Sequence, residues 1–185
     1  KRQVGIVEGY TDVMAAHLAG ITTAVATCGT AFGADHIRII RRLLMDDDAF
    51  RGEVIFTFDG DAAGQKAAMR AFSEDQKFVT QTFVAVEPDG LDPCDLRQIK
   101  GDLALRDLIA KRVPLFEFAI RTELKLHNLT TAEGRVNALN ATAPLVAQIR
   151  DKSLRPEYSR LLAGWLGIEV EIVTSAVSQG VRRAA

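Results

Sequence analysis

Acidic side chains follow the β-rich segments of this 185-residue sequence, at positions where they could act together. Glu8 comes directly after the first such segment, Asp59 and Asp61 after the third, and Asp92 and Asp95 shortly after the fourth. Carboxylate oxygens are the ligands that hard divalent cations such as Mg²⁺ or Mn²⁺ prefer. Mg²⁺ held by a few carboxylates, with positions left for phosphate oxygens, is usual in enzymes of phosphoryl or nucleotidyl transfer. The residue types therefore indicate that chemistry.

Mutual repulsion between these carboxylates supports a bound cation. Two carboxylates about 5 Å apart repel by roughly 3 kcal/mol at an effective dielectric constant near 20. Four or five at one place would repel by several times that amount, which is comparable with the whole stability of a domain. No Lys or Arg lies between Gly9 and Gly20, or between Asp59 and Gln65. Asp59 and Asp61 stand two residues apart, so an extended chain points both side chains to one side.

Each acidic residue also has a purely structural interpretation. Asp12, at the start of the predicted helix after Glu8, could serve only as a helix N-cap. Asp92 stands before Pro93 and could likewise begin a helix that has proline at its first position. Glu8 lies on a different strand from the paired aspartates and could be a further metal ligand or the general base. The residues alone leave these roles open.

Short β-rich segments alternate with helical patterns through the first hundred residues. This alternation predicts an α/β domain with a mostly parallel sheet covered by helices on both faces. In such sheets, ligands bind beyond the carboxyl ends of the strands, which is where the acidic residues fall. The predicted strands are 3–7, 23–27, 53–58 and 82–86, and the predicted helices are 11–19, 35–44 and 64–72.

After Pro93 the pattern becomes helical and no further strand is predicted. Pro144 falls inside one predicted helix and should kink or divide it. We therefore expect an α/β domain over residues 1–101 and a small all-α helical bundle over residues 102–185. The predicted helices are 102–112, 115–127, 132–149 and 156–165, with a further one from residue 168.

Composition excludes several classes of protein. The chain is 48% hydrophobic and 25% charged, as in ordinary globular domains, so disorder is excluded. Two cysteines make no disulfide framework, and no apolar run approaches the roughly 18 residues of a membrane span. The net charge of −1 divides unevenly, because residues 1–102 carry 11 basic and 16 acidic residues and the remainder carry 12 and 8. An acidic half with a net charge of −5 is thus joined to a basic half of +4.

The order of these motifs resembles the Toprim domain, a fold shared by bacterial primases, topoisomerases and some nucleases. Glu8 and Asp59-Gly60-Asp61 match the glutamate and the Asp-x-Asp pair of that family. The finer resemblance is to bacterial replicative primases of the DnaG type. Segments similar to that family's motifs are 7–13 (EGYxDV), 29–37, 58–64 (FDGDxAG) and 89–93 (DGxDP).

The resemblance implies an enzyme that copies single-stranded DNA into short RNA primers by metal-dependent nucleotidyl transfer. Glu8 would be the catalytic acid or base, and it could also bind metal together with Asp59 and Asp61. Asp92 would be a further metal ligand and Asp12 would have a supporting role. Where many family members have Asp-Pro-Asp, this chain has Asp92-Pro93-Cys94-Asp95, so Asp95 could take the place of the second acid.

The resemblance also implies partners and further domains. The partners would be a single-stranded DNA template, ribonucleoside triphosphates and the replicative helicase. The helicase would bind through a C-terminal domain absent from this sequence, and zinc would belong to an equally absent N-terminal domain. The chain is therefore expected to be a fragment of a longer protein that acts in the cytoplasm, at the nucleoid, and not at a membrane.

Two other functions fit parts of the sequence. The chain could be a metal-dependent module that binds nucleic acid or a partner protein without activity of its own. It could also be a phosphatase of the haloacid-dehalogenase type, which places Asp-x-Asp after a strand. That class typically has Thr or Val where Ala63 stands here, its later catalytic Lys is not evident, and it leaves Glu8 unexplained.

Overall fold

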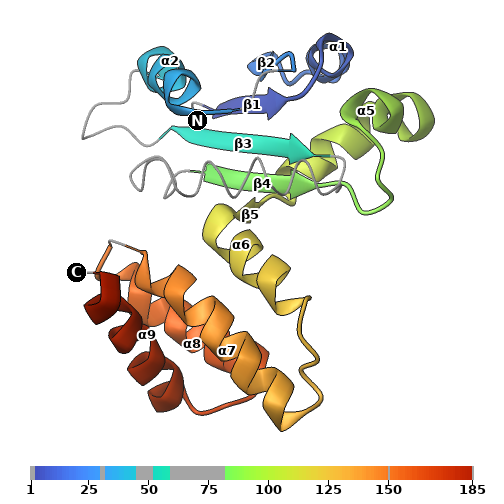
Figure 1. Ribbon diagram of the computed structural model, residues 1–185. Coiled ribbons are helices and arrows are strands. Elements are labelled where there is room, and N and C mark those ends of the chain that lie inside the picture. The colour runs from blue at the N-terminus through green and yellow to red at the C-terminus, as the bar shows by residue number, and fades with distance from the viewer. Residues whose placement is uncertain (1–2, 30–31, 45–51, 59–81, 150, 185) are drawn as a thin grey trace. The chain divides into compact units, whose positions relative to one another are not determined.

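The computed structural model describes residues 3–29, 32–44, 52–58, 82–149 and 151–184, except for the side chains of Phe58 and residues 182–184 (Figure 1). The chain divides into two compact units, Lys1–Leu115 and Phe116–Ala185. The sequence pattern predicted this division between residues 101 and 102. The structure places it later because the helix that contains those residues packs with the sheet.

The first unit is built on a sheet of five strands among its described residues, in the order β2-β1-β3-β4-β5 (Figure 1). The first four strands are parallel, and β5 is antiparallel to β4, so the prediction of a mostly parallel sheet is confirmed. β5 was not predicted. The strands are β1 Gln3–Val7, β2 Ala24–Ala26, β3 Glu53–Phe58, β4 Thr82–Val86 and β5 Val113–Pro114.

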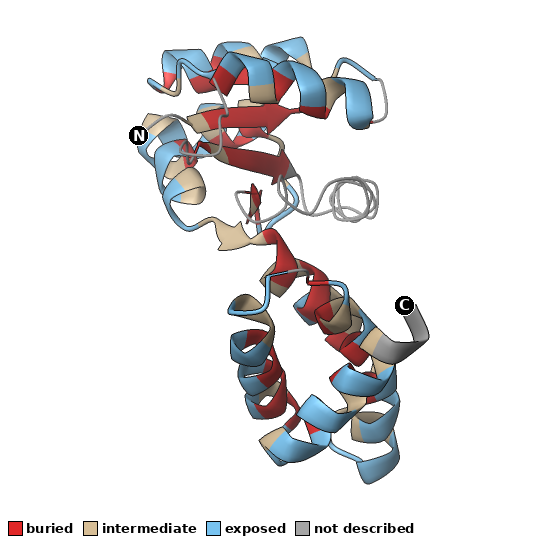
Figure 2. Cartoon of the chain, turned by 90° about the vertical axis from the view of Figure 1, so that its left-hand side faces the viewer, coloured by how far each residue is buried: buried red, intermediate tan, exposed pale blue. Residues whose placement is uncertain are grey.

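The central strand β3 is buried on both faces of the sheet (Figure 2). The residues from Val54 to Thr57 are each no more than 2% exposed. On one face, the ring of Phe56 meets Phe32 edge-on with 4.7 Å between the ring centroids. On the other face, Thr57 lines a small void together with Ala16. Burial on both faces is the reason that β3 is an uninterrupted β-branched and aromatic segment.

Helices α1 (Tyr10–Leu18) and α5 (Pro93–Ala110) pack against each other in the first unit. The side chains of Ala15 and Ala19 from the α1 segment form a buried cluster with Leu96 and Leu105 of α5. The first half of α5 was predicted only as the structural interpretation of Asp92-Pro93, and the helices predicted from the pattern after Pro93 began at residue 102. Gly101 does interrupt the helical geometry, with φ 84°, but helix continues on both sides of it and both halves are buried in the cluster.

Helix α2 (Ala34–Leu44) buries Ile37, Ile40 and Leu44. The chain passes from β1 outward to β2 and then back across β1 to β3. Because such connections are right-handed, α1 and α2 lie on opposite faces of the sheet. Asp35 lies within the first turn of α2 and forms an ion pair with Arg38 at 2.9 Å.

The second unit is helical in all of its described elements, as predicted. Its helices are α6 (Leu115–Leu124), α7 (Ala132–Ala147), α8 (Leu154–Leu166) and α9 (Val170–Ala184). The buried core of this unit contains Phe116, Ile120, Leu139, Val146, Leu162, Leu166 and Val173. No helix in the described part of the chain is long and apolar enough to cross a membrane.

Pro144 was expected to kink or divide its helix, and it does not divide α7. The helix continues past it to Ala147, which is only three residues further on. A proline this close to the end of a helix removes one backbone hydrogen bond and leaves little helix to disrupt.

On the facing helix, a Cβ added at Gly180 would lie 3.0 Å from the Cβ of Ala147, so glycine permits the close approach of α9 to α7.

Two adjacent leucines of α8 provide a test of this core. Leu162 is fully buried, whereas Leu161 is 45% exposed. We expect Leu162→Ala to lower the free energy of unfolding of the helical unit by about 2 to 5 kcal/mol, because it opens a cavity. Leu161→Ala is the control and should cost less than about 1 kcal/mol. Urea denaturation followed by the fluorescence of Trp165, the single tryptophan, measures both, and equal costs would contradict the assigned core.

Candidate active site

The strand pairing brings the carboxyl ends of the parallel strands to one edge of the sheet. Val7 at the end of β1 pairs with Ala26 at the end of β2, and Phe58 at the end of β3 pairs with Val86 at the end of β4. The order in which strands are added reverses here, because β2 lies on one side of β1 and the next strand, β3, lies on its other side. Ligands of open parallel sheets bind at such a switch point, beyond the carboxyl ends of the strands. Glu8 directly follows β1 and therefore lies there.

Glu8 has a firmly held backbone and a carboxylate that faces solvent. Its carbonyl oxygen accepts a hydrogen bond from the backbone N–H of Cys28 at 3.0 Å, which continues the pairing of β1 with the β2 segment. Cys28 and Gly29 then have positive φ values of 53° and 77°, so the chain turns away from the sheet. The Glu8 side chain is exposed. A fixed backbone with an accessible carboxylate suits either a metal ligand or a proton acceptor.

Asp12 is buried and its carboxylate holds two segments of backbone together. The residue is 5% exposed. Its Oδ2 accepts the N–H of Gly9 at 3.0 Å, and its Oδ1 accepts the N–H of Cys94 at 3.3 Å. The side chain thus joins the start of α1 to the start of α5, across 82 residues of sequence. Asp12 is the third residue of α1 (position N3), and the N-cap of this helix is Gly9.

Asp92 is the N-cap of α5, with Pro93 in the first turn, as the structural interpretation of this motif predicted. Its Oδ1 accepts the backbone N–H of Asp95 at 2.7 Å, while the side chain of Asp95 is exposed. A cap bond occupies one carboxylate oxygen and leaves the other for a further ligand. The geometry is therefore compatible with both roles proposed for Asp92.

Asp59 and Asp61, the paired aspartates of the predicted metal site, lie outside the described residues. They follow β3, which ends at Phe58. Within the described ranges, no three His, Cys, Asp or Glu side chains come together as a metal site. The set of metal ligands expected from the sequence therefore stays a prediction.

Sequence reasoning missed the ion pairs of Lys100 with two acidic residues at this edge. Glu87, directly after β4, is 3% exposed, and its Oε1 lies 3.3 Å from Lys100 Nζ. The same ammonium lies 2.5 Å from Asp89 Oδ2. The pKa of Lys100 is raised, chiefly by its hydrogen bond to Asp89. The sequence contained one signal, a glutamate directly before a Pro-Asp-Gly turn, but a helix from Pro93 that could supply Lys100 was only one of the two interpretations of Asp92-Pro93.

Comparison with known proteins yields two family matches. Residues 2–85 match the Toprim domain, and residues 116–171 match a family described as the DnaB-helicase binding domain of primase. The second match lies inside the chain, whereas the sequence analysis expected the helicase-binding part to be absent.

Individual relatives are DNA primases. The chain is 62% identical over 165 residues to the DNA primase of Mycobacterium tuberculosis, covering 89% of this chain and 26% of that protein. It is 58% identical over 180 residues to the DNA primase of Streptomyces coelicolor, covering 97% of this chain and 28% of that protein. The chain thus spans about a quarter of the length of the curated relatives it matches.

A solved structure of similar fold supports the same assignment. It is the RNA polymerase domain of the Mycobacterium tuberculosis primase DnaG, in complex with a double-stranded DNA oligomer that has a 6-nucleotide overhang. The TM-score is 0.81 at 62% identity, and the match covers 90% of this chain and 52% of that chain. The sheet and its carboxyl edge are those of a Toprim domain. The chain belongs to the DnaG-type bacterial primases, as their Toprim domain and the helical subdomain that follows it.

Asp12 provides a test of how the site is held together. In Asp12→Ala the N–H groups of Gly9 and Cys94 lose their acceptor, and each unsatisfied group costs about 1 to 3 kcal/mol when buried. We therefore expect the free energy of unfolding of the first unit to fall by at least about 2 kcal/mol. Hydrogen exchange at the Gly9 and Cys94 amides, followed by NMR, measures the loss.

The matched control is Asp95→Ala, which removes an exposed carboxylate from the first turn of α5. Its cost should stay below about 1 kcal/mol, since an exposed charge in the first turn of a helix gains at most about that much from the helix dipole. An Asp12→Ala variant that was no less stable than this control would contradict the linking role of Asp12.

Proposed function

We propose that this chain is the catalytic Toprim part of a bacterial replicative primase, with the helical subdomain that follows. The whole enzyme would be a DNA-directed RNA polymerase that makes short primers from ribonucleoside triphosphates on single-stranded DNA. It would act at the nucleoid, in the cytoplasm. The phosphatase alternative is set aside, because the family match accounts for both Glu8 and the Asp-x-Asp motif.

The observation that carries this proposal is the exposed carboxylate of Glu8 at the switch point between β1 and β3. Primer synthesis needs a group that accepts the proton of the attacking hydroxyl, and a carboxylate on a rigid strand end can do so. The loop that carries Asp92 begins at the same edge, after β4.

The donor set fits a hard divalent cation. Glu8, Asp92, Asp59 and Asp61 offer only carboxylate oxygens, which suit Mg²⁺ or Mn²⁺. When bound, the cation would lower the pKa of the attacking hydroxyl and stabilise negative charge on the leaving pyrophosphate. Asp12, with both of its oxygens bonded to backbone N–H groups, would position the others, and Asp95 would be at most a peripheral ligand.

Glu8→Gln tests the proposal in the full-length primase. The amide is close to the carboxylate in shape but is neutral and not basic, so we expect primer synthesis to fall by at least about 100-fold while the fold is retained. The matched control is Asp107→Asn, an exposed carboxylate in the second half of α5, which should leave the rate unchanged. A Glu8→Gln enzyme that made primers at near wild-type rate would refute the catalytic role.

Calorimetric titration of the 185-residue chain with Mn²⁺ distinguishes the two roles left open for Glu8. If Glu8 is the base, Glu8→Gln should retain Mn²⁺ affinity, whereas if it is a ligand the affinity should fall. Asp59→Asn serves as the reference for loss of a ligand and should abolish binding. Unchanged affinity in Asp59→Asn would remove the metal site from the proposal.

The family match of residues 116–171 favours a second function for the helical unit. We infer that this unit binds the replicative helicase, in addition to any contact made by parts of the enzyme outside this sequence. The unit has its own buried core and carries exposed apolar side chains, among them Leu126 and Val136, which are 74% and 56% exposed. It can therefore fold as a module and still present apolar surface to a partner.

Binding to the purified helicase hexamer tests this second function. We expect the whole chain to bind in a fluorescence-anisotropy titration and a chain that ends at Leu115 not to bind, because the shorter chain keeps the first unit but lacks the helical one. Equal binding by the two chains would assign the contact to the Toprim unit and contradict the inference.

A further inference from the structure

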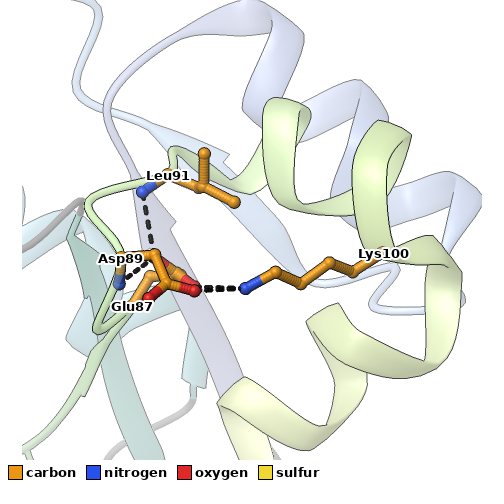
Figure 3. Close-up of polar contacts among 4 residues, drawn as sticks. All are labelled: Glu87, Asp89, Leu91 and Lys100. Atoms are coloured by element: carbon orange, nitrogen blue, oxygen red, sulfur yellow. Dashed lines mark hydrogen bonds and ion pairs between the residues drawn. The ribbon is translucent and has the colours of Figure 1, made fainter.

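The loop from Glu87 to Leu91 is folded around its own first residue (Figure 3). The Oε2 atom of Glu87 accepts the backbone N–H groups of Asp89 at 2.7 Å and of Leu91 at 2.9 Å. The Glu87 carbonyl oxygen accepts the N–H of Gly90 at 3.4 Å. Gly90 has a φ of 76°, which lets the chain turn tightly at this point. Three successive N–H groups are therefore bound by one residue.

Lys100 fixes this loop to helix α5 (Figure 3). A carboxylate as buried as that of Glu87 is costly without a charged or hydrogen-bonding partner. Lys100 Nζ supplies the charge at 3.3 Å from Glu87 Oε1 and also binds Asp89 Oδ2 at 2.5 Å. Because the pKa of Lys100 is raised, the ammonium stays charged at neutral pH. Strand β4, the loop and the first half of α5 are thus joined at one point.

Asp92 stands between two such anchors. The N–H of Leu91, just before it, is bound by Glu87, and the N–H of Cys94, two residues after it, is bound by Asp12. The backbone on both sides of Asp92 is therefore held by buried carboxylates that lie on other elements or at the far end of the loop. Metal sites depend on such supporting contacts, whose loss typically costs about 10- to 100-fold in affinity or activity.

We propose that Glu87, held by Lys100, is a positioning residue that places Asp92 for metal binding in primer synthesis and is not itself a metal ligand. This inference rests on the proposed function. One oxygen of the Glu87 carboxylate is bonded to two backbone N–H groups and the other to an ammonium, so binding a cation would require breaking the contacts that shape the loop.

The test is the Mn²⁺ dependence of primer synthesis by the full-length primase. For Glu87→Gln and Lys100→Met we expect the Mn²⁺ concentration at half-maximal rate to rise about 10-fold. The rate at saturating Mn²⁺ should stay within about threefold of wild type, because the ligands themselves are intact and excess metal compensates for their looser placement. Lys100→Arg, which keeps a charged donor, should restore most of the Mn²⁺ dependence.

Lys111→Met is the matched control, since Lys111 is an exposed lysine at the C-cap of the same helix. It should leave the Mn²⁺ dependence unchanged. Should Glu87→Gln fail to fold, Lys100→Met carries the test, because the Lys100 side chain is 41% exposed and its replacement leaves no cavity.

Two results would overturn the proposal. The first is a Lys100→Met enzyme with the Mn²⁺ dependence of Lys111→Met. The second is a folded Glu87→Gln chain that loses Mn²⁺ binding in calorimetry as completely as Asp59→Asn, which would make Glu87 a ligand. Failure of the proposed function gives a different result. If the proposed function is wrong, Glu8→Gln keeps its primer synthesis. If only this inference is wrong, Glu8→Gln loses primer synthesis and Lys100→Met keeps the wild-type Mn²⁺ dependence.

Discussion

The parallel pairing of β1 with β3 is the constraint on which the candidate site depends. Gln3 pairs with Glu53 and Ile6 with Phe56, so the two strands end within one residue of each other at the carboxyl edge. A slip of one residue would exchange the two faces of β1, so that Val4 and Ile6 would change places with Gly5 and Val7 and the packing on both faces would be disrupted. The apolar core therefore specifies the register, and the register specifies where Glu8 lies.

The acidic residues near this edge divide into two groups according to what binds them. Asp12 and Glu87 are buried, and their oxygens are bonded to backbone N–H groups or to Lys100. Glu8 is exposed and Asp92 is partly so. The protein itself therefore stabilises the buried carboxylates of Asp12 and Glu87, and among the described residues the carboxylates offered to a cation are those of Glu8 and Asp92.

Local patterns predicted the elements that are determined by local chemistry. The bounds of β1, β3 and β4 agree to the residue with the β-rich segments of the sequence, because a strand buried on both faces must be apolar throughout. Strand β5 has only two residues, Val113 and Pro114, and exists because it pairs with the edge of β4. No pattern can show so short a strand. The helix start at Asp92-Pro93 was open to two interpretations, and the continuation through Gly101 was not predicted, because Gly101 interrupts the helical geometry between two segments that nevertheless pack together.

The pattern of residues alone was sufficient to predict the class of fold, the mostly parallel sheet and the placement of acidic residues, Glu8 among them, at the strand ends. These follow from the period of the apolar residues and from the rule that parallel strands end at one edge. Which acids face solvent and which hold the backbone depends on how the elements pack in three dimensions. Asp12 reaches Cys94 and Lys100 reaches Glu87 through the packing of α5 beside α1 and β4, and contacts between residues distant in sequence leave no local pattern from which they could be predicted.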